Sequence, residues 1–421
     1  MKRFMPTLAF AGVWLALAGC HTAAVRGSVE PIRMRVASIL RETPLVDGHN
    51  DLLVHYHACR EGCPRGLDAY DIGGHVSGHT DIPRWQQGMV GAQLLNSGYI
   101  ESERDLAGTL KGFAFTRDMV AHYSDHLAMA QNSSEVRAIH AAGKIAILLA
   151  LEDPDRLGTD EATIRRLAAE GLRSDILAYE EPSRLADGHA GPMKFGGLSP
   201  LGNQVVRWMQ RNGILVDLSH SSSDTARDVL DQSIAPVIFS HSSAAALCDV
   251  SRNVPDDVLR RLPANGGIVM VSFVPEFTRK AYSDWYDAGG AYATRLLKEY
   301  DGNRDATKPL MDAWEKANPA PPVTVADVAD HVEHVRDIAG IDHVGIGSDF
   351  DGIDFTIAGL EDVSKFPNLL EELARRGWSN ADLRKLAGEN FLRVLDAADA
   401  VRDASRRTSQ SVDAAAAPDV R

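Results

Sequence analysis

Basic residues are scarce in this sequence of 421 residues, in which 44 lysines and arginines stand against 58 aspartates and glutamates. The formal net charge at pH 7 is therefore −14, and no run rich in lysine or arginine offsets it. An acidic chain of this kind repels phosphate backbones. We therefore expect no nucleic-acid partner.

Long hydrophobic runs are also missing once the first twenty residues are passed. No later stretch reaches the roughly 18 apolar residues that a membrane-spanning helix needs. The composition, with 44% hydrophobic and 24% charged residues, is that of an ordinary globular protein. It excludes collagen, a coiled coil and overall disorder as the class of the whole chain.

Cysteine is rare as well, with four in the chain. In an oxidising compartment, Cys59 and Cys63 are close enough in sequence to close a small disulfide loop, or they stay free thiols, and Cys248 is left unpaired. A metal site at Cys59-x3-Cys63 is disfavoured because there is no second cysteine pair to complete four ligands.

The first twenty residues have the pattern of an export signal. Lys2 and Arg3 precede an apolar stretch over residues 4–18, which ends in Leu17-Ala18-Gly19-Cys20. A basic start, a short apolar run and small residues are typical of a secretory signal. A cysteine directly after Leu-Ala-Gly matches the bacterial lipobox, which predicts cleavage before Cys20 and a lipid on its thiol. A plain signal peptide that happens to contain cysteine is the alternative.

The remaining chain divides into three parts. Residues 21–40 are mixed in character and predict a tether, residues 41–400 one domain, and residues 401–421, which lack an apolar period, a disordered tail. His21 follows the cysteine where an aspartate would favour the inner membrane. We therefore expect a lipid-anchored protein of the bacterial cell envelope, on the outer membrane and facing the periplasm.

Short apolar runs alternate with stretches of helical periodicity between residues 41 and 400. The runs are Leu45-Val46-Asp47, residues 91–95, 145–151, 176–178, 214–218, 237–239, 268–273, and Val344-Gly345-Ile346. Runs that are continuously apolar, rather than alternating, indicate strands buried on both faces, as in a parallel sheet. Eight such strands with helices between them predict an α/β fold consisting of a single (β/α)8 barrel. A doubly wound open sheet is less favoured, because no glycine-rich phosphate loop follows the first run.

Histidines and acidic residues stand just past the ends of several of these runs. They are His49, Asp51, Glu152, His220, His241 and Asp349. In a barrel the carboxyl ends of the strands share one face, where active sites are built. Each histidine taken singly is better explained as a hydrogen-bonded core residue, but six such groups at matching strand ends favour a metal site. They suffice for two divalent metals bridged by a carboxylate.

Several motifs resemble those of the membrane (renal-type) dipeptidases, peptidase family M19, among the amidohydrolase-like metal barrels. The resemblance extends from about Pro44 to Leu395. The motifs are Val46-Asp47-Gly48-His49-Asn50-Asp51, Thr80-Asp81-Ile82-Pro83-Arg84, Gly88-Met89-Val90-Gly91-Ala92-Gln93, Gly196-Gly197-Leu198-Ser199, Leu215-Val216-Asp217-Leu218-Ser219-His220, Phe239-Ser240-His241-Ser242, Ser251-Arg252-Asn253-Val254-Pro255-Asp256, Gly347-Ser348-Asp349-Phe350-Asp351-Gly352 and Gly388-Glu389-Asn390-Phe391.

This resemblance implies a zinc-dependent dipeptidase with two zinc ions per chain. It assigns His49, Asp51 and the bridging Glu152 to one ion, and Glu152 with His220 and His241 to the other. A hydroxide between the metals would then attack the peptide carbonyl.

Two further residues acquire roles from the same resemblance. Asp349 would act as the proton shuttle between the attacking water and the leaving amine. Arg252 would bind the carboxylate of the substrate, which suits its bidentate guanidinium.

One segment departs from the family pattern. After the fourth strand the family usually reads Arg-Tyr-x-Thr-Leu-Thr-His-Asn, and that histidine polarises the scissile carbonyl. Here Tyr179 occupies the position by count, and His189 follows ten residues later. Either side chain is a candidate substrate-binding group, and losing one oxyanion donor typically costs about 10²–10³ in rate.

Three functions remain in competition at this point. The first is hydrolysis of dipeptides or similar small carboxylates. The second is another amidohydrolase reaction, on N-acyl amino acids or lactones, and the third is metal binding by an accessory lipoprotein with little hydrolytic activity. The expected partners are the substrate, the membrane through the lipid anchor, and a second copy of the chain in a homodimer.

Overall fold

The computed structural model describes residues 31–57, 66–100 and 103–416. Cys20, Cys59 and Cys63 lie outside these residues, as does the whole export signal, so the expectations for them stay predictions. Cys248 is a buried free thiol. No helix in the described part of the chain is long and apolar enough to cross a membrane.

The described residues form one sheet of nine parallel strands. They are β1 (Leu45–Asp47), β2 (Val90–Asn96), β3 (Leu127–Met129), β4 (Ile145–Ala150), β5 (Leu172–Ile176), β6 (Leu215–Asp217), β7 (Ile238–Phe239), β8 (Ile268–Val271) and β9 (Val344–Ile346). Their order is β2-β1-β9-β8-β7-β6-β5-β4-β3, and a further pairing of β2 with β4 closes the sheet. Eight strands therefore make a closed barrel, and the predicted (β/α)8 fold is confirmed.

The strand β3 lies outside this barrel and was not expected from the sequence. It pairs with the first half of β4, from Leu127↔Ile145 to Met129↔Ile147. The strand β5 pairs with the second half of β4, at Leu149↔Leu172 and Ala150↔Ser174. β4 therefore has two neighbours along one edge and β2 along the other.

Helices and short helical turns connect the strands. They are α2 (Val54–His57), η1 (Leu67–Tyr70), α3 (Ile82–Gln87), α4 (Leu106–His122), α5 (Ser133–Ala141), α6 (Glu161–Ala169), α7 (Pro200–Arg211), α8 (Ser223–Gln232), α9 (Asp256–Leu259), α10 (Leu262–Asn265), α11 (Pro275–Thr278), α12 (Lys280–Glu299), α13 (Arg304–Ala317), α14 (Val325–Ala339), η2 (Ile341–His343), η3 (Val363–Lys365), α15 (Phe366–Arg375), α16 (Asn380–Arg384), η4 (Lys385–Glu389) and α17 (Asn390–Ala416). The expected helix after Thr324 begins with a capping box, in which Thr324 and Asp327 satisfy each other's backbone donors.

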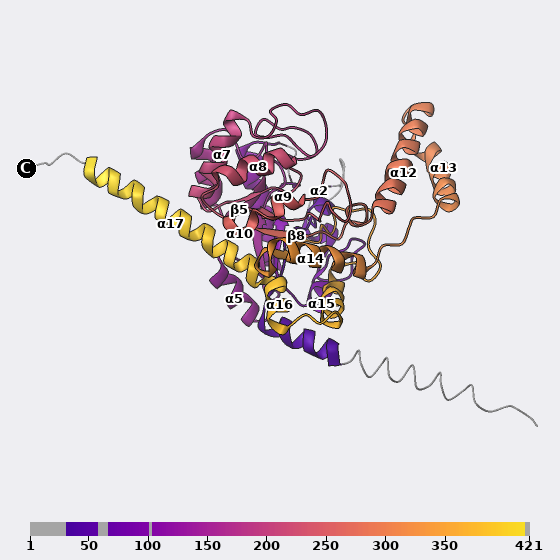
Figure 1. Ribbon diagram of the computed structural model, residues 1–421, viewed down its shortest axis with the longest axis horizontal. Helices are drawn as coiled ribbons and strands as arrows, with labels where there is room; N and C mark the ends of the chain where they lie inside the picture. The colour runs from indigo at the N-terminus through magenta and orange to yellow at the C-terminus, as the bar shows by residue number, and fades with distance from the viewer. Residues whose placement is uncertain (1–30, 58–65, 101–102, 417–421) are drawn as a thin grey trace, which may run out of the picture.

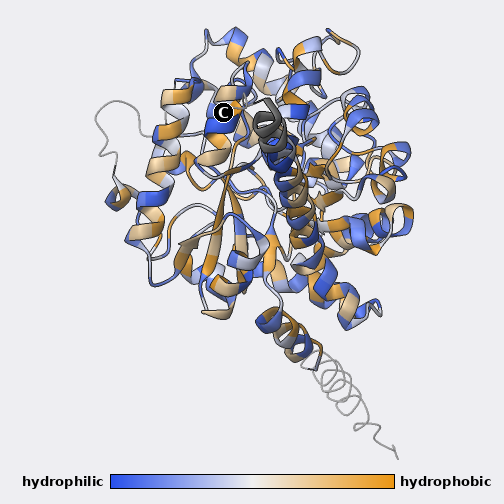
Figure 2. Ribbon diagram, turned by 90° about the vertical axis from the view of Figure 1, so that its left-hand side faces the viewer, coloured by the Kyte–Doolittle hydropathy of each residue, from blue (hydrophilic) through white to orange (hydrophobic). Residues whose placement is uncertain are grey.

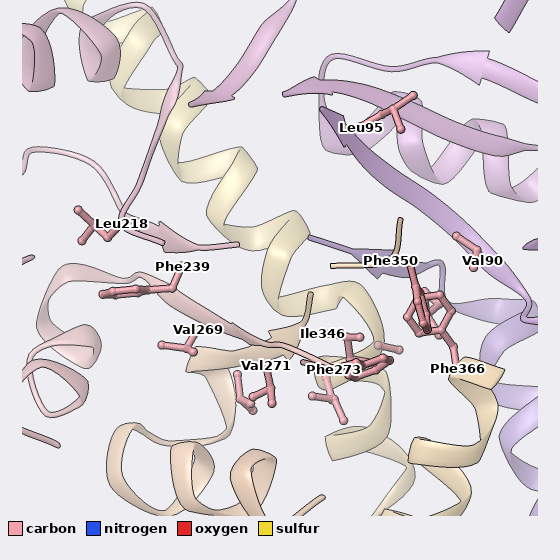
Figure 3. Close-up of a cluster of buried hydrophobic side chains, with 14 of the residues drawn as sticks. Val90, Leu95, Leu218, Phe239, Val269, Val271, Phe273, Ile346, Phe350 and Phe366 are labelled. Carbon is pink, nitrogen blue, oxygen red and sulfur yellow. The ribbon is translucent and has the colours of Figure 1, made fainter. Parts of the chain in front are cut away.

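Hydrophobic side chains fill the space between the barrel and its helices. In Figure 2 the strands are largely orange, whereas blue residues lie on the outer faces of the helices. Figure 3 shows Phe273, Phe350 and Phe366 meeting in this core, with ring centroids 5.6–5.8 Å apart. Such edge-to-face and tilted contacts add to the gain from burying the rings.

A second cluster closes one end of the barrel. Phe391 and Leu395 of α17 pack with strand residues such as Val46 and Met270. A Cβ atom on Gly388 would lie 2.1 Å from the carbonyl oxygen of Pro44, so η4 approaches the start of β1 very closely. The amino-terminal end of the barrel is thus filled, and the carboxyl ends of the strands are left for the site.

Both ends of the predicted domain need correction. Residues 31–42 are helical, and Val36, Ile39 and Leu40 are buried, where the sequence predicts a tether up to residue 40. At the other end α17 continues to Ala416, where a disordered tail is expected from residue 401. Figure 1 shows α17 running along the barrel and beyond it. The apolar residues of the first helix are too few to reveal its burial from the sequence alone.

The helices α12 and α13, inserted between β8 and β9, project from the body of the molecule (Figure 1). Aromatic residues hold the pair together, with the rings of Trp285 and Trp314 5.8 Å apart.

Candidate metal centre

The six ligand-type residues predicted from the sequence all lie near the carboxyl ends of barrel strands. His49 and Asp51 follow β1, and Glu152 follows β4. His220, His241 and Asp349 follow β6, β7 and β9. Five of these side chains are almost fully buried, and Asp349 is partly buried. The barrel therefore brings together groups that are up to 300 residues apart in sequence.

The carboxylate of Glu152 lies at the middle of this group. Its Oε1 atom is 2.9 Å from His220 Nε2 and 3.1 Å from His241 Nε2. Its Oε2 atom is 3.5 Å from His49 Nε2, which in turn is 3.3 Å from Asp51 Oδ1. Glu152 thus faces one histidine on one side and two histidines on the other, as a bridging ligand would.

The donor atoms fit divalent metal ions better than they fit one another. His220 Nε2 and His241 Nε2 are 3.0 Å apart and face each other. His49 Nε2 is buried and has no hydrogen-bond partner among the described residues. His49 with Asp51 and Glu152, and Glu152 with His220 and His241, each offer three ligand atoms within 4.8 Å of one another. Imidazole nitrogens with carboxylate oxygens suit zinc and similar divalent ions.

The protonation of His241 also suits metal binding. Burial lowers the pKa of His241 well below its usual value, and the nearby charges of His49 and Arg252 act in the same direction. The imidazole is therefore neutral at pH 7, and neutral imidazole is the form that binds a metal. Its other nitrogen, Nδ1, is 2.8 Å from Ser240 Oγ, which fixes the orientation of the ring.

Asn96 is a functional candidate that the sequence reasoning missed. Its Nδ2 atom donates to Asp51 Oδ1 at 3.0 Å and to Glu152 Oε2 at 3.3 Å, so one amide holds two candidate ligands. The residue ends β2 in the same way that the six predicted groups follow their strands. A search of the strand ends for amide side chains, as well as for histidines and carboxylates, would have found Asn96.

Glu180 was also missed, and it lies behind His220. Its Oε1 atom accepts from His220 Nδ1 at 3.0 Å, and its Oε2 atom accepts from His189 Nε2 at 2.8 Å. These hydrogen bonds hold the pKa of Glu180 far below its usual range. It is an ionised carboxylate on a loop, and only its position after β5 points to it in the sequence.

Backbone strain is present at two of the site residues. His220 and Asp349 have φ angles of 64° and 68°, in the left-handed region that residues with a Cβ atom rarely adopt. Strain of this kind costs about 1–3 kcal/mol and is typical of functional sites. Gly352 is needed nearby, because a Cβ atom there would lie 2.3 Å from Asp51 Oδ2 and 2.6 Å from Asp349 Oδ1.

Asp349 lies among other acidic groups in the site. Burial raises the pKa of its carboxyl well above the usual value; His49 opposes this rise, while the negative charges of Asp51 and Glu152 add to it. A carboxyl whose pKa is raised takes up a proton more readily than an ordinary one, which suits a group that exchanges protons during a reaction.

Arg252 is a buried cation with unused hydrogen-bond donors. Its side chain is 4% exposed, and Nη1 donates to Ser242 Oγ at 2.7 Å. Nε and Nη2 have no partner among the described residues. The guanidinium lies over the ring of Phe277, and both line a cavity of about 570 Å³. Unpaired donors on a buried cation point to an anionic ligand.

Tyr179 and His189 have different surroundings. Tyr179 lines a second cavity, of about 650 Å³, together with Asn96 and Glu152. Its ring stacks on that of His220, with centroids 4.5 Å apart. His189 uses both ring nitrogens, Nε2 on Glu180 and Nδ1 at 3.0 Å from Ser251 Oγ. In this conformation neither nitrogen of His189 is free for a substrate.

A family model described as membrane dipeptidase, peptidase family M19, matches residues 33–409. The chain belongs to this family. Curated members include the dipeptidase verJ of Clonostachys rogersoniana. It is 35% identical to this chain over 393 residues, and the match covers 90% of each of the two proteins. The dipeptidase aclJ of Aspergillus oryzae is 35% identical over 370 residues, covering 85% of this chain and 78% of that protein. The chain is therefore a hydrolase of the M19 dipeptidase family.

Solved structures with the same fold are also known. The probable dipeptidase PvdM from Pseudomonas aeruginosa has a TM-score of 0.73 and 23% identity, covering 89% of this chain and 99% of that one. A metallopeptidase from Rhodobacter sphaeroides, liganded with a phosphinate mimic of the dipeptide L-Ala-D-Ala, has a TM-score of 0.67 and 25% identity. The match covers 85% of this chain and 99% of that one.

Proposed function

We propose that this M19 family member is a dipeptidase that works with two zinc ions. The observation that carries the proposal is the position of Glu152 between His49 on one side and His220 and His241 on the other. The Nε and Nη2 donors of the buried Arg252 side chain, which have no partner among the described residues, support a substrate with a free carboxylate.

The ligands divide between two metal positions. His49, Asp51 and Glu152 would hold one ion, and Glu152, His220 and His241 the other. When bound, zinc acts as a Lewis acid and lowers the pKa of bound water toward neutrality.

Arg252 and Asp349 supply the remaining chemistry. Arg252 binds the carboxylate of the dipeptide through its free Nε and Nη2 donors, and this orients the peptide bond toward the metal ligands. Asp349 takes a proton from the attacking water and returns it to the nitrogen of the leaving amine. Burial of the Arg252 side chain excludes water and strengthens its interaction with the carboxylate.

A second reaction is favoured by one observation. Tyr179 stands where an imidazole would polarise the scissile carbonyl, and its side chain is partly open, with the residue 45% exposed. N-acyl amino acids offer Arg252 the same free carboxylate as a dipeptide. Lactones lack that carboxylate, but their ester carbonyl is more reactive than an amide and would depend less on that hydrogen bond.

The location of the protein follows from its first residues. Lipidation of Cys20 would attach the chain to the outer membrane and expose the barrel to the periplasm, where dipeptides from peptide uptake or wall turnover occur. Assembly as a homodimer is part of the same proposal.

The decisive experiment combines metal analysis with a substrate panel. The mature protein, dialysed against dilute zinc, should contain about two zinc ions per chain. It should hydrolyse L,L or L,D dipeptides faster than N-acetyl amino acids or lactones, and amidated dipeptides should be poor substrates because they lack the carboxylate. A value near one or zero metals rejects the binuclear site, and a preference for N-acetyl amino acids or lactones establishes the second reaction instead.

A further inference from the structure

Two adjacent residues after β5 hold His220 from two sides. The ring of Tyr179 stacks on the ring of His220, with an interplanar angle of 26°. The carboxylate of Glu180 accepts a hydrogen bond from His220 Nδ1 at 3.0 Å. The opposite nitrogen, Nε2, faces Glu152 and His241. His220 itself has a left-handed backbone conformation, so its ring needs support from outside its own segment.

Glu180 is in turn held in place by its own neighbours. Its second oxygen accepts from His189 Nε2, and its backbone carbonyl accepts from Ala190 N at 2.9 Å. His189 donates its backbone N–H to the carbonyl of His220 at 2.7 Å. Gly188 allows this close approach, since a Cβ atom there would lie 2.5 Å from the carbonyl oxygen of Glu180. The loop and His220 therefore form one connected unit.

We propose that Glu180 is a positioning residue for the metal ligand His220. By accepting a hydrogen bond from Nδ1–H, it selects the tautomer of His220 whose Nε2 lone pair faces Glu152 and His241, and it makes Nε2 a stronger metal-binding atom. Removing such a carboxylate behind a ligating histidine typically weakens metal binding by about 10–100-fold. The inference rests on the proposed metal site, and it gives a role to the segment in which Tyr179 replaces the expected imidazole.

The same contacts could instead describe a third metal ion. Glu180, His189 and His220 also offer three ligand atoms within 4.8 Å of one another. A metal at His220 Nδ1 would require the ring to lose both protons, because Nε2 already faces the other ligand set. The side chain of Glu180 is 48% exposed, so water competes for any ion there. Hydrogen bonding is the better explanation of the contact.

The test compares variants at one loop. Glu180→Ala removes both hydrogen bonds, and Glu180→Gln keeps the shape while removing the charge. Glu181→Gln is the matched control, because it removes the same charge from the next residue. Among the described residues, Glu181 makes no contact with His220. Zinc stoichiometry is measured by elemental analysis, and zinc affinity by competition with a fluorescent chelator. The melting temperature of the metal-free protein reports on folding.

The Glu180→Ala chain should bind one of its two zinc ions about 10–100-fold more weakly, and Glu180→Gln should lie between it and the wild type. Glu181→Gln should match the wild type, and the metal-free melting temperatures should agree. Unchanged affinity in Glu180→Ala, with two zinc ions in the wild type, overturns the positioning role alone. Three zinc ions in the wild type, falling to two in Glu180→Ala and His189→Ala, also overturn it. A wild type without zinc overturns the proposed function as well.

Discussion

At the scale of single residues, environment decides which of several similar groups can do chemistry. His331 is as buried as His241, but its Nδ1 accepts from the backbone of Ala244 and its Nε2 lies 2.9 Å from the carbonyl of Thr278. Both nitrogens are satisfied by the backbone, so it is a structural histidine, as its helical position predicts. His241 has one nitrogen directed at other ligand-type groups instead. The partners of that nitrogen, ligand-type side chains rather than backbone groups, distinguish the two.

Asp349→Asn tests the proton shuttle at this scale. The amide keeps the volume of the side chain but cannot accept and return a proton, so turnover should fall by about 10²–10⁴. Zinc content should stay nearly unchanged, because the other five residues supply both metal positions. Glu152→Gln is the companion variant and should lose metal along with activity. Steady-state rates and elemental analysis on the same samples give the answer, and a fully active Asp349→Asn protein would remove Asp349 from the mechanism.

At the scale of elements, buried charges tie strands to helices that are distant in sequence. Arg173 of β5 is 3% exposed and pairs with Asp399 of α17 at 2.7 Å. This contact explains why β5 differs from its prediction. The sequence places a strand at residues 176–178, whereas the strand covers Leu172–Ile176 and buries Arg173, Ser174 and Asp175. Polar residues hide a strand from a hydrophobicity pattern when their partners come from elsewhere in the chain.

The short helix α11 contains a carboxyl group whose burial should make stability depend on pH. Burial raises the pKa of Glu276 to about 7, and its own backbone N–H only partly opposes this, while Asp354 and Asp287 add to it. The folded state therefore binds this proton more tightly than the unfolded state does. The stability contributed by the protonated form is present below about pH 4.5 and is lost as pH rises to about 7.

Glu276→Gln should remove this loss of stability at neutral pH, because the amide carries no charge to bury. Above pH 7 the variant should be more stable than the wild type by up to about 3 kcal/mol, and near pH 4.5 the two should agree. Urea unfolding at both pH values measures the difference. Glu299→Gln, which removes an exposed glutamate from the end of α12, is the control and should show no such dependence. An equal difference at both pH values would mean that Glu276 is not the titrating group.

At the scale of the whole molecule, the barrel and the predicted export signal bear on different properties. The described barrel carries the complete candidate site, whereas the proposed location rests on the export signal predicted in the first residues.

Cys20→Ala tests the anchor. The variant should leave the membrane fraction or accumulate unprocessed, because no thiol remains to be lipidated. Its activity on dipeptides should persist, since the site lies in the barrel. Fractionation and gel mobility of the two chains decide this, and identical behaviour would mean that the export signal is a plain one.

Local patterns in the sequence determined the architecture and most of the candidate site. Continuous apolar runs mark strands buried on both faces, and such strands close into a barrel whose strand ends converge. The sequence therefore predicts one group of ligands, which consists of His49, Asp51, Glu152, His220 and His241.

Tertiary structure alone decided the features that depend on partners distant in sequence. The burial of Val36, Ile39 and Leu40, the position of β5, and the contact of Glu180 with His220 each need a second segment to become favourable. The free donors of Arg252 belong to the same class, because a sequence identifies an arginine but not which of its nitrogens are left unpaired. The physical reason is that burial and hydrogen bonding are properties of the assembled chain, whereas apolar periodicity is a property of each segment.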